Sequence, residues 1–222
     1  MLSKIETSDG SASLVSKEYG VSYHSKFGAV TESAHVFIGA GLRDKALDQE
    51  EIHILETGFG TGLNAFLSAI EAEILQRTVH YTGLEIHPIS QELAADMGYA
   101  QALQIPEKEG LYLAMHQAAL EKPVELSPRY TFTKKHTPIE QFEAKEAFDV
   151  IYFDAFAPLA QPELWTEEVF QRMYQALKPD GILVTYCAQG AFKRILKSVG
   201  FAVERLKGPP GKREMTRARK LI

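Results

Sequence analysis

The sequence predicts an α/β fold in which seven strands form a mostly parallel sheet with helices on both faces. From Ile52 onward, short apolar runs alternate with amphipathic segments, a pattern typical of β-α units around a parallel sheet. A cluster of glycines and a single aspartate, Asp154, follow two of these apolar runs directly. Open α/β sheets bind ligands at such strand ends, so we expect a functional site there.

Size and composition indicate one large domain. The 222 residues are 45% hydrophobic and 24% charged, which is enough to bury a sizeable core. The apolar runs are shorter than the roughly 20 residues of a membrane helix, and the N-terminus lacks the regions of a signal peptide. We therefore expect a cytoplasmic protein with no membrane partner. The oligomeric state is left open.

The cysteine and metal content points to no special chemistry. The single cysteine, Cys187, ends the apolar run from Gly181 and is expected to be a buried strand thiol rather than half of an internal disulfide. We find no spaced set of metal ligands, and no metal is expected.

Residues 1–45 are expected to form a small separate element. The stretch from Lys4 to Ser16 predicts a hairpin around Ser8-Asp9-Gly10, and the stretch from Ser25 to Leu42 predicts a short helix through Val36 and its apolar neighbours.

The main domain, residues 46–222, contains the alternating elements. The expected strands are 52–57, 79–85, 129–134, 148–153, 180–187, 200–206 and 213–220. The expected helices lie near 62–76, 88–98, 163–177 and 189–198. Residues 99–128 interrupt the alternation and predict a short helical insertion, and the last two strands predict an antiparallel hairpin.

The first strand of the main domain runs into Glu56-Thr57-Gly58-Phe59-Gly60-Thr61-Gly62-Leu63-Asn64. Alternate glycines let the backbone approach a ligand closely. A dinucleotide-binding loop would carry its third glycine at position 63, which is Leu63 here. The loop instead resembles motif I of class I S-adenosylmethionine-dependent methyltransferases, which have a Rossmann-like fold. The acidic residue suits that cofactor, because it has no phosphate and carries a sulfonium and an ammonium. A tight turn without a ligand is the alternative.

Further cofactor contacts are expected around this loop. Glu85 ends the next strand, 23 residues after Gly62, where a carboxylate can accept both ribose hydroxyls; a solvated strand-end glutamate is the alternative. His136 and Thr137 follow the third strand and are candidates for the adenine contact. Tyr23, in the N-terminal element, could close over the cofactor.

Three blocks, in order, carry a more specific resemblance. They are ETGFGTGLN (56–64), FDAFAPLAQPELWT (153–166) and GPPGKREM (208–215). Together with the stretch from Tyr19 to Gly41 they resemble the bacterial tRNA 5-aminomethyl-2-thiouridine methyltransferases. The resemblance implies S-adenosylmethionine-dependent N-methylation of the wobble uridine in the tRNA anticodon loop, giving 5-methylaminomethyl-2-thiouridine. Bifunctional members also carry an FAD-dependent oxidoreductase domain, for which a chain ending at Ile222 has no room, so a stand-alone methyltransferase is expected.

The resemblance assigns roles around Asp154, the expected catalytic residue. Asp154 would orient the substrate amine as a hydrogen-bond acceptor, because an unperturbed aspartate is too weak to be a general base. A proton-accepting role would require burial near Phe153, Phe156 and Trp165 to raise its pKa. The expected contacts to the modified base are Phe156, Ala157, Pro158 and Trp165. Core packing is the alternative for the two aromatic side chains.

Charge is distributed unevenly along the chain. Residues 193–222 hold ten Lys or Arg against two Glu, a net charge of +8. Because the whole chain carries −5, residues 1–192 carry −13. We expect Lys207, Lys212, Arg213 and Arg217 to contact tRNA phosphates, with Lys193 and Arg194 nearby. A solvated basic face is the alternative. Two other functions stay open: methylation of a free small amine, and a non-catalytic RNA-binding module on a methyltransferase fold.

Overall fold

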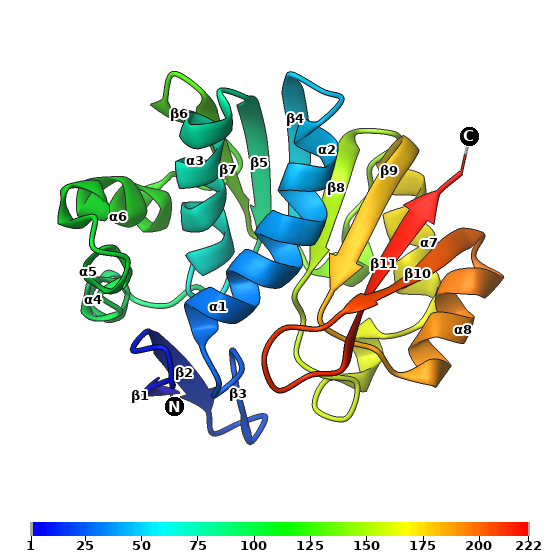
Figure 1. Cartoon of the computed structure of the whole chain (residues 1–222), viewed down its shortest axis with the longest axis horizontal. Helices are drawn as coiled ribbons and strands as arrows, with labels where there is room; N and C mark the ends of the chain where they lie inside the picture. Colours follow the sequence, from blue (N-terminus) through cyan, green and yellow to red (C-terminus); the bar gives the residue numbers. More distant parts are fainter. Residues whose placement is uncertain (1, 222) are drawn as a thin grey trace.

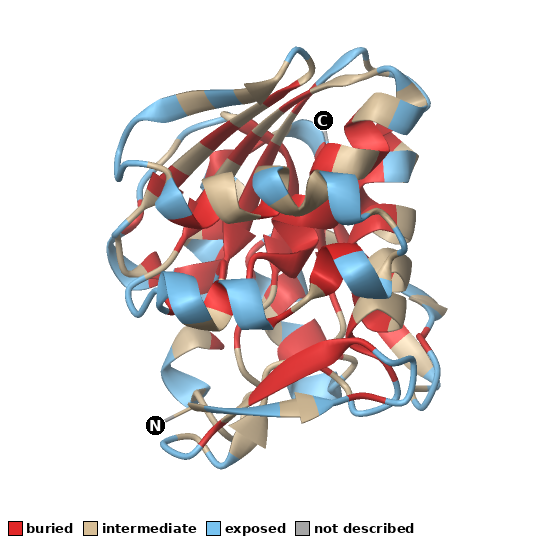
Figure 2. Ribbon diagram, turned by 90° about the vertical axis from the view of Figure 1, so that its left-hand side faces the viewer, coloured by how far each residue is buried: buried red, intermediate tan, exposed pale blue. Residues whose placement is uncertain are grey.

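The computed structural model describes residues 2–221. They form a large twisted sheet with helices on both faces and a small three-stranded sheet below one end of it (Figure 1). Figure 2 shows the buried residues gathered in the interior and the exposed ones on the outer surfaces of the helices and loops. The expected α/β class is therefore confirmed.

The large sheet has eight strands in the order β10-β11-β9-β8-β4-β5-β7-β6. Their bounds are β4 Glu51–Thr57, β5 Thr78–Leu84, β6 Pro123–Ser127, β7 Tyr130–Lys135, β8 Phe148–Phe153, β9 Leu177–Thr185, β10 Phe201–Lys207 and β11 Glu214–Lys220. Strands β7, β5, β4, β8 and β9 run parallel. The last hairpin, β10 and β11, is antiparallel as expected, and β11 also pairs antiparallel with β9.

The helices of the main domain divide between the two faces of this sheet. They are α3 Leu63–Leu75, α4 Gln91–Asp96, α5 Tyr99–Ala102, α6 Glu109–Gln117, α7 Glu167–Ala176 and α8 Gly190–Ser198, with 3₁₀ turns η2 Pro106–Lys108, η3 Ile139–Gln141 and η4 Pro162–Leu164. Side chains of a strand alternate between two faces: Val150 and Tyr152 join the core under α3 and α6, whereas Ile151 and Phe153 join the core under α7 and α8.

Two expectations for the main domain are wrong in detail. Residues 99–128 are not wholly helical, because β6 pairs antiparallel with β7 and places Val124 opposite Phe132, which adds the eighth strand. Pro123 is tolerated there because β6 is the edge strand. The helix expected from 163 begins only at Glu167, since Thr166 accepts a hydrogen bond from the Val169 amide and caps it.

The N-terminal region contains the expected hairpin and a longer helix than expected. The small sheet consists of β1 Leu2–Glu6, β2 Ala12–Ser16 and β3 Val21–Ser22. A continuous helical stretch follows, divided into α1 Ala29–Ser33, the π-helical η1 Ala34–Leu42 and α2 Arg43–Ala46. It packs on the sheet at Gly41, where a Cβ would lie 2.9 Å from the Tyr152 ring. This close packing holds the small sheet beside the carboxyl ends of the parallel strands.

Two further expectations concern single features. Cys187 is buried and free, two residues after β9, as the apolar run indicated. Among the described residues, no helix combines the length and the apolar character needed to cross a membrane.

Asp149 provides a test of how the central strands are held together. Its buried carboxylate accepts hydrogen bonds from the His53 amide of β4 at 2.8 Å and from Lys178 at 2.9 Å. We expect Asp149→Ala to lower the free energy of unfolding by about 1.5–3 kcal/mol in urea titrations, because a charged acceptor for two donors is lost. Asp149→Asn, which keeps one acceptor oxygen, should cost less. Equal stability of Asp149→Ala and wild type would contradict this account.

Candidate active site

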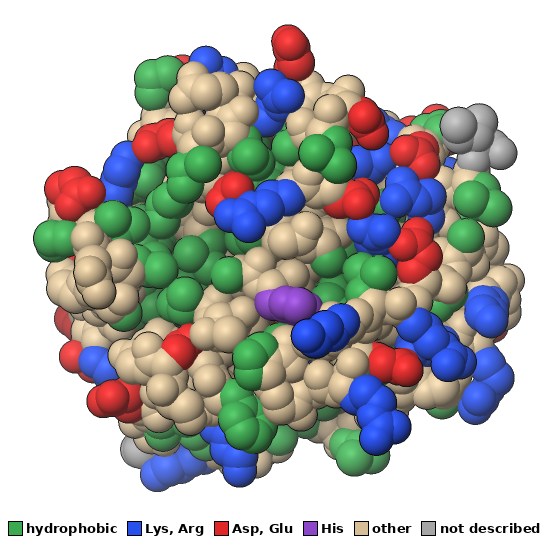
Figure 3. Space-filling model, in the orientation of Figure 1, with side chains coloured by type: hydrophobic (Ala, Val, Ile, Leu, Met, Phe, Trp, Pro, Cys, Tyr) green, Lys and Arg blue, Asp and Glu red, His purple; other side chains and the backbone are tan. Residues whose placement is uncertain are grey.

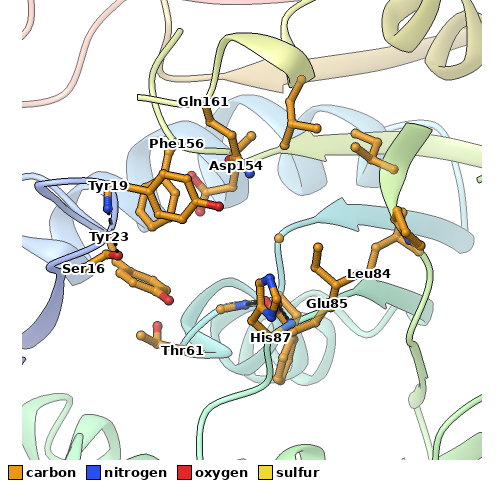
Figure 4. Close-up of a pocket in the computed structure, with 18 of the residues that line it drawn as sticks. Ser16, Tyr19, Tyr23, Thr61, Leu84, Glu85, His87, Asp154, Phe156 and Gln161 are labelled. Carbon is orange, nitrogen blue, oxygen red and sulfur yellow. Dashed lines mark hydrogen bonds between the residues drawn. The ribbon is translucent and has the colours of Figure 1, made fainter. Parts of the chain in front are cut away.

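A cavity of about 440 Å³ opens at the carboxyl ends of β4, β5 and β8, and residues of the small N-terminal sheet and its loops line one side of it. Figure 4 shows Asp154 and Phe156 on one side of it, Leu84, Glu85 and His87 on another, and side chains of the N-terminal sheet on a third. Its volume falls in the range of about 300–1,000 Å³ typical of small-molecule sites. The cavity therefore lies at the strand end that carries Asp154.

The glycine-rich loop between β4 and α3 forms the floor of the cavity. Gly58, Gly60 and Gly62 all have positive φ, at +85°, +52° and +75°, a conformation that side chains disfavour. At Gly62 a Cβ would also lie 2.8 Å from the Phe59 ring. The predicted residues Gly58, Phe59, Gly60, Thr61 and Asn64 line the cavity. Glu56 is buried behind the loop.

Glu85 ties this loop to the end of β5. Its two carboxylate oxygens accept hydrogen bonds from the amides of Gly60 at 2.8 Å and His87 at 2.7 Å. Each oxygen keeps a lone pair, and the side chain lines the cavity. Glu85 is thus held by the protein and is still able to accept hydrogen bonds from a ligand.

Aromatic side chains close the cavity on the N-terminal side. Tyr19 and Tyr23 pack on Phe156 with ring centroids 4.9 and 5.0 Å apart. Burial, with the charge of Glu85 adding to it, raises the pKa of Tyr23 to about 12, so its hydroxyl keeps its proton. Tyr23 and Phe156 were predicted from the sequence. Tyr19 was not, although it begins the N-terminal stretch that carries the family resemblance.

A side-chain amide joins two carboxyl groups at the back of the cavity. Asn64, near the start of α3, donates hydrogen bonds to Glu56 Oε1 and to Asp154 Oδ2, both at 2.8 Å. Glu56 is the second-to-last residue of β4 and Asp154 follows β8, and these strands are parallel neighbours. Within the described part of the chain, Glu56 Oε2 and Asn64 Oδ1 are buried without a hydrogen-bond partner. Two acidic groups therefore share one donor beside the cavity.

The N-terminal helix and the C-terminal loop add a second charged pair. Lys212 Nζ lies 2.5 Å from Glu32 Oε1 and 4.0 Å from the centroid of the Tyr186 ring, and the Tyr186 hydroxyl donates to the Ala155 carbonyl at 2.8 Å. The negative charge of Glu32 raises the pKa of Asp154, and the positive charge of Lys212 lowers it. Lys212, predicted to contact tRNA phosphates, lines the hollow next to the cavity.

These surroundings change the acidity of both carboxyl groups. Burial, reinforced by Glu32, raises the pKa of Asp154 from 3.8 to about 7, against the opposing effects of the Asn64 hydrogen bond and Lys212. Burial and the neighbouring Asp154 also raise the pKa of Glu56. The raised pKa that a proton-accepting Asp154 would require is therefore present.

Of the remaining predicted residues, Thr137 lines the cavity and the others fall outside it. Trp165 is buried against Phe153 and Phe192, and its indole donates to the Phe156 carbonyl at 2.7 Å. It packs in the core and supports the loop after Asp154. Thr137 lines the cavity, whereas His136 lies against the Ile86 carbonyl at 3.0 Å. Ala157 and Pro158 line a separate hollow next to the cavity.

The predicted RNA contacts differ in how they are engaged. Arg217 pairs with Asp44 at 2.5 Å and with Glu204 at 2.7 Å on the outer sheet. Lys207 and Arg213 are exposed and form no ion pair with the carboxylates that the structure describes.

One group of potential metal ligands was not expected. Glu51, His53 and His80 meet at the opposite end of β4 and β5, because parallel register places His53 beside His80. Their Nε2 atoms lie 3.4 and 3.0 Å from Glu51 Oε1. Both ring nitrogens therefore face one carboxylate oxygen, and the two rings stack 4.7 Å apart at 18°. This geometry suits a hydrogen-bonded surface cluster.

Residues 112–221 match a family model described as S-adenosyl-L-methionine-dependent methyltransferase. The chain is 36% identical over 216 residues to the tRNA 5-methylaminomethyl-2-thiouridine biosynthesis bifunctional protein MnmC of Cupriavidus necator, covering 90% of this chain and 32% of that protein. It is 30% identical to the protein of the same name from Azoarcus sp., covering 93% and 34%. The chain thus spans about a third of the length of these relatives.

Two solved structures share the fold. The crystal structure of MNMC2 from Aquifex aeolicus superposes with a TM-score of 0.75 at 24% identity, covering 98% of this chain and 70% of that one. Spermidine synthase from Thermotoga maritima superposes with a TM-score of 0.54 at 18% identity, covering 99% and 68%. At these identities the likeness concerns the fold.

The acidity of Asp154 makes a prediction about stability. Its pKa is raised in the folded protein, so the folded state binds more protons than the unfolded chain between pH 4 and pH 7, and wild type loses stability as pH rises through this range. Asp154→Asn does not titrate there. We expect the melting temperature of Asp154→Asn minus that of wild type, measured by scanning calorimetry, to increase from pH 5 to pH 8. A difference that stays constant with pH would contradict the raised pKa.

Proposed function

The chain belongs to the S-adenosyl-L-methionine-dependent methyltransferases, and we propose that it methylates the amine of 5-aminomethyl-2-thiouridine at the wobble position of tRNA. The relatives named for biosynthesis of 5-methylaminomethyl-2-thiouridine align with 90% or more of this chain, which supports this substrate. The observation that carries the proposal is Asp154, a carboxyl group with a pKa near 7 at the cavity wall.

The residues around the cavity fit S-adenosylmethionine. Gly58 and Gly60 line its floor and would let the cofactor approach the backbone closely. Glu85 offers acceptors for ribose hydroxyls, and Asn64 Oδ1 offers one for the ammonium. Glu56 and Asp154 supply acidic groups near a cationic ligand. When bound, the cofactor supplies an electrophilic methyl group, whose carbon–sulfur bond breaks, leaving its electron pair on sulfur, as the amine nitrogen bonds to carbon.

Asp154 contributes by orienting the amine and handling its proton. An alkylamine resembles a lysine side chain with a pKa of about 10.4, so forming the neutral amine at pH 7 costs about 4.6 kcal/mol in water. An apolar site wall, including Phe156, lowers that cost by disfavouring the ammonium. Asp154 then accepts a hydrogen bond from nitrogen and aims its lone pair. A pKa near 7 also lets it take up the proton that the methylated amine sheds.

The test uses tRNA that carries 5-aminomethyl-2-thiouridine and radiolabelled S-adenosylmethionine. We expect label in tRNA and 5-methylaminomethyl-2-thiouridine in its nucleoside mass spectrum. Asp154→Asn should lower kcat/KM by about 10²-fold or more, because the orienting and proton-accepting group is lost. Asp48→Asn, which removes an exposed carboxylate, is the matched control and should be fully active. The proposal is wrong if wild type leaves this tRNA unlabelled or methylates a free small amine as efficiently.

Asn64 provides a separate test as a positioning residue. Asn64→Ala removes the donor shared by Glu56 and Asp154, so the pKa of Asp154 should rise further. The acid limb of the kcat/KM profile should move to higher pH, and activity at pH 7 should fall more than activity at pH 9. Ser68→Ala, a buried change in the same helix that touches neither carboxyl, should leave the profile in place. A uniform loss at every pH would assign Asn64 a merely structural role.

A further inference from the structure

The basic residues of the C-terminal region fall into two groups. Five are engaged with acidic groups: Lys193 with Glu214, Lys212 with Glu32, Arg217 with Asp44 and Glu204, Arg219 with Asp180, and Lys220 with Glu146. These ion pairs join α8, β11 and the C-terminal loop to the rest of the fold. They account for half of the basic residues from Lys193 onward.

The other five basic residues are exposed and form no ion pair with any carboxylate of residues 2–221. They are Arg194, Lys197, Arg205, Lys207 and Arg213. They lie on three adjoining segments, α8, β10 and the loop 208–213, which we call the α8–β10 face. Lys and Arg side chains gather over this part of the molecule in the lower right of Figure 3. The chain otherwise carries a net negative charge, so the uncompensated positive charge is local.

This face adjoins the loop that follows Asp154. A hollow of about 630 Å³ separates the loop after Asp154 from the C-terminal loop, and its walls include Pro158, Tyr186 and Arg213. The Tyr186 hydroxyl is bonded to the Ala155 carbonyl, so the hollow and Asp154 share one wall. An RNA strand lying on the α8–β10 face would therefore pass the opening beside the reacting group.

We propose that the α8–β10 face binds the phosphodiester backbone of the substrate RNA, while the hollow beside Pro158 and Tyr186 admits the modified nucleoside. The inference rests on the proposed function. Charge complementarity identifies the partner, because exposed cations without acidic partners release counterions when they meet phosphates. An anticodon nucleotide must also leave its stack to reach an active site, and the adjoining hollow provides space for it.

The experiment compares two double variants with the same change in charge. Lys197→Gln/Lys207→Gln removes two cations from the α8–β10 face, and Lys122→Gln/Lys145→Gln removes two exposed lysines from outside it. Binding of fluorescent tRNA is measured by anisotropy from 50 to 300 mM salt, without cofactor. We expect the first variant to raise Kd about 10-fold near 150 mM salt and to reduce the log–log salt slope by about 1.4–1.8. The second should bind like wild type.

The outcomes separate this inference from the proposed function. Weaker binding by the first variant alone, with its melting temperature retained, supports the inference. Equal losses in both variants, or none in either, would overturn it even if wild type methylates tRNA. Absence of methyl transfer by wild type would instead reject the proposed function, because binding is measured independently. Binding of the α8–β10 face to anionic vesicles in preference to tRNA would also overturn the inference.

Discussion

The side-chain amide of Asn64 holds the acidic centre together. It donates at 2.8 Å to Glu56 and at 2.8 Å to Asp154, and so joins the end of β4, the first turn of α3 and the end of β8. Parallel pairing of β4 with β8 brings both carboxyl groups to one edge of the sheet. Asp154 raises the pKa of the buried Glu56, and the hydrogen bond from Asn64 opposes that effect. The glycine loop, Glu85 and the aromatic cover are arranged around this centre.

Charge is balanced across segments far apart in the chain. Glu32 comes from the N-terminal helix and raises the pKa of Asp154, while Lys212 from the C-terminal loop pairs with Glu32 and opposes that effect. The N-terminal element therefore does more than cover the cavity, since it contributes to the acidity of Asp154. The same C-terminal loop carries Arg213 outward. One loop thus links the ionisation of Asp154 with the surface proposed to bind RNA.

Features with a local signal could be predicted from the sequence. Asp154, Glu85 and the glycine loop each follow a recognisable apolar strand, and all three lie at the cavity. Features set by tertiary pairing could not. The bridge through Asn64 depends on which strands are neighbours, and the pair of Lys212 with Glu32 spans 180 positions. The direction in which Trp165 points depends on where α7 begins. Strand β6 forms because it can pair with the free edge of β7. The sequence likewise does not show which Lys and Arg residues of the C-terminal region form ion pairs.

The central claim is that the fold poises Asp154 to change ionisation near neutral pH. Its titration can be followed directly by NMR of protein labelled with ¹³C at the aspartate carboxyls, with Asp154→Asn used to assign the signal. A midpoint near 7, as the buried surroundings and Glu32 require, would support an Asp154 that orients the amine and takes its proton. A midpoint close to the ordinary value of 3.8 would contradict the account, because Asp154 would then be a fixed anion unable to hold that proton.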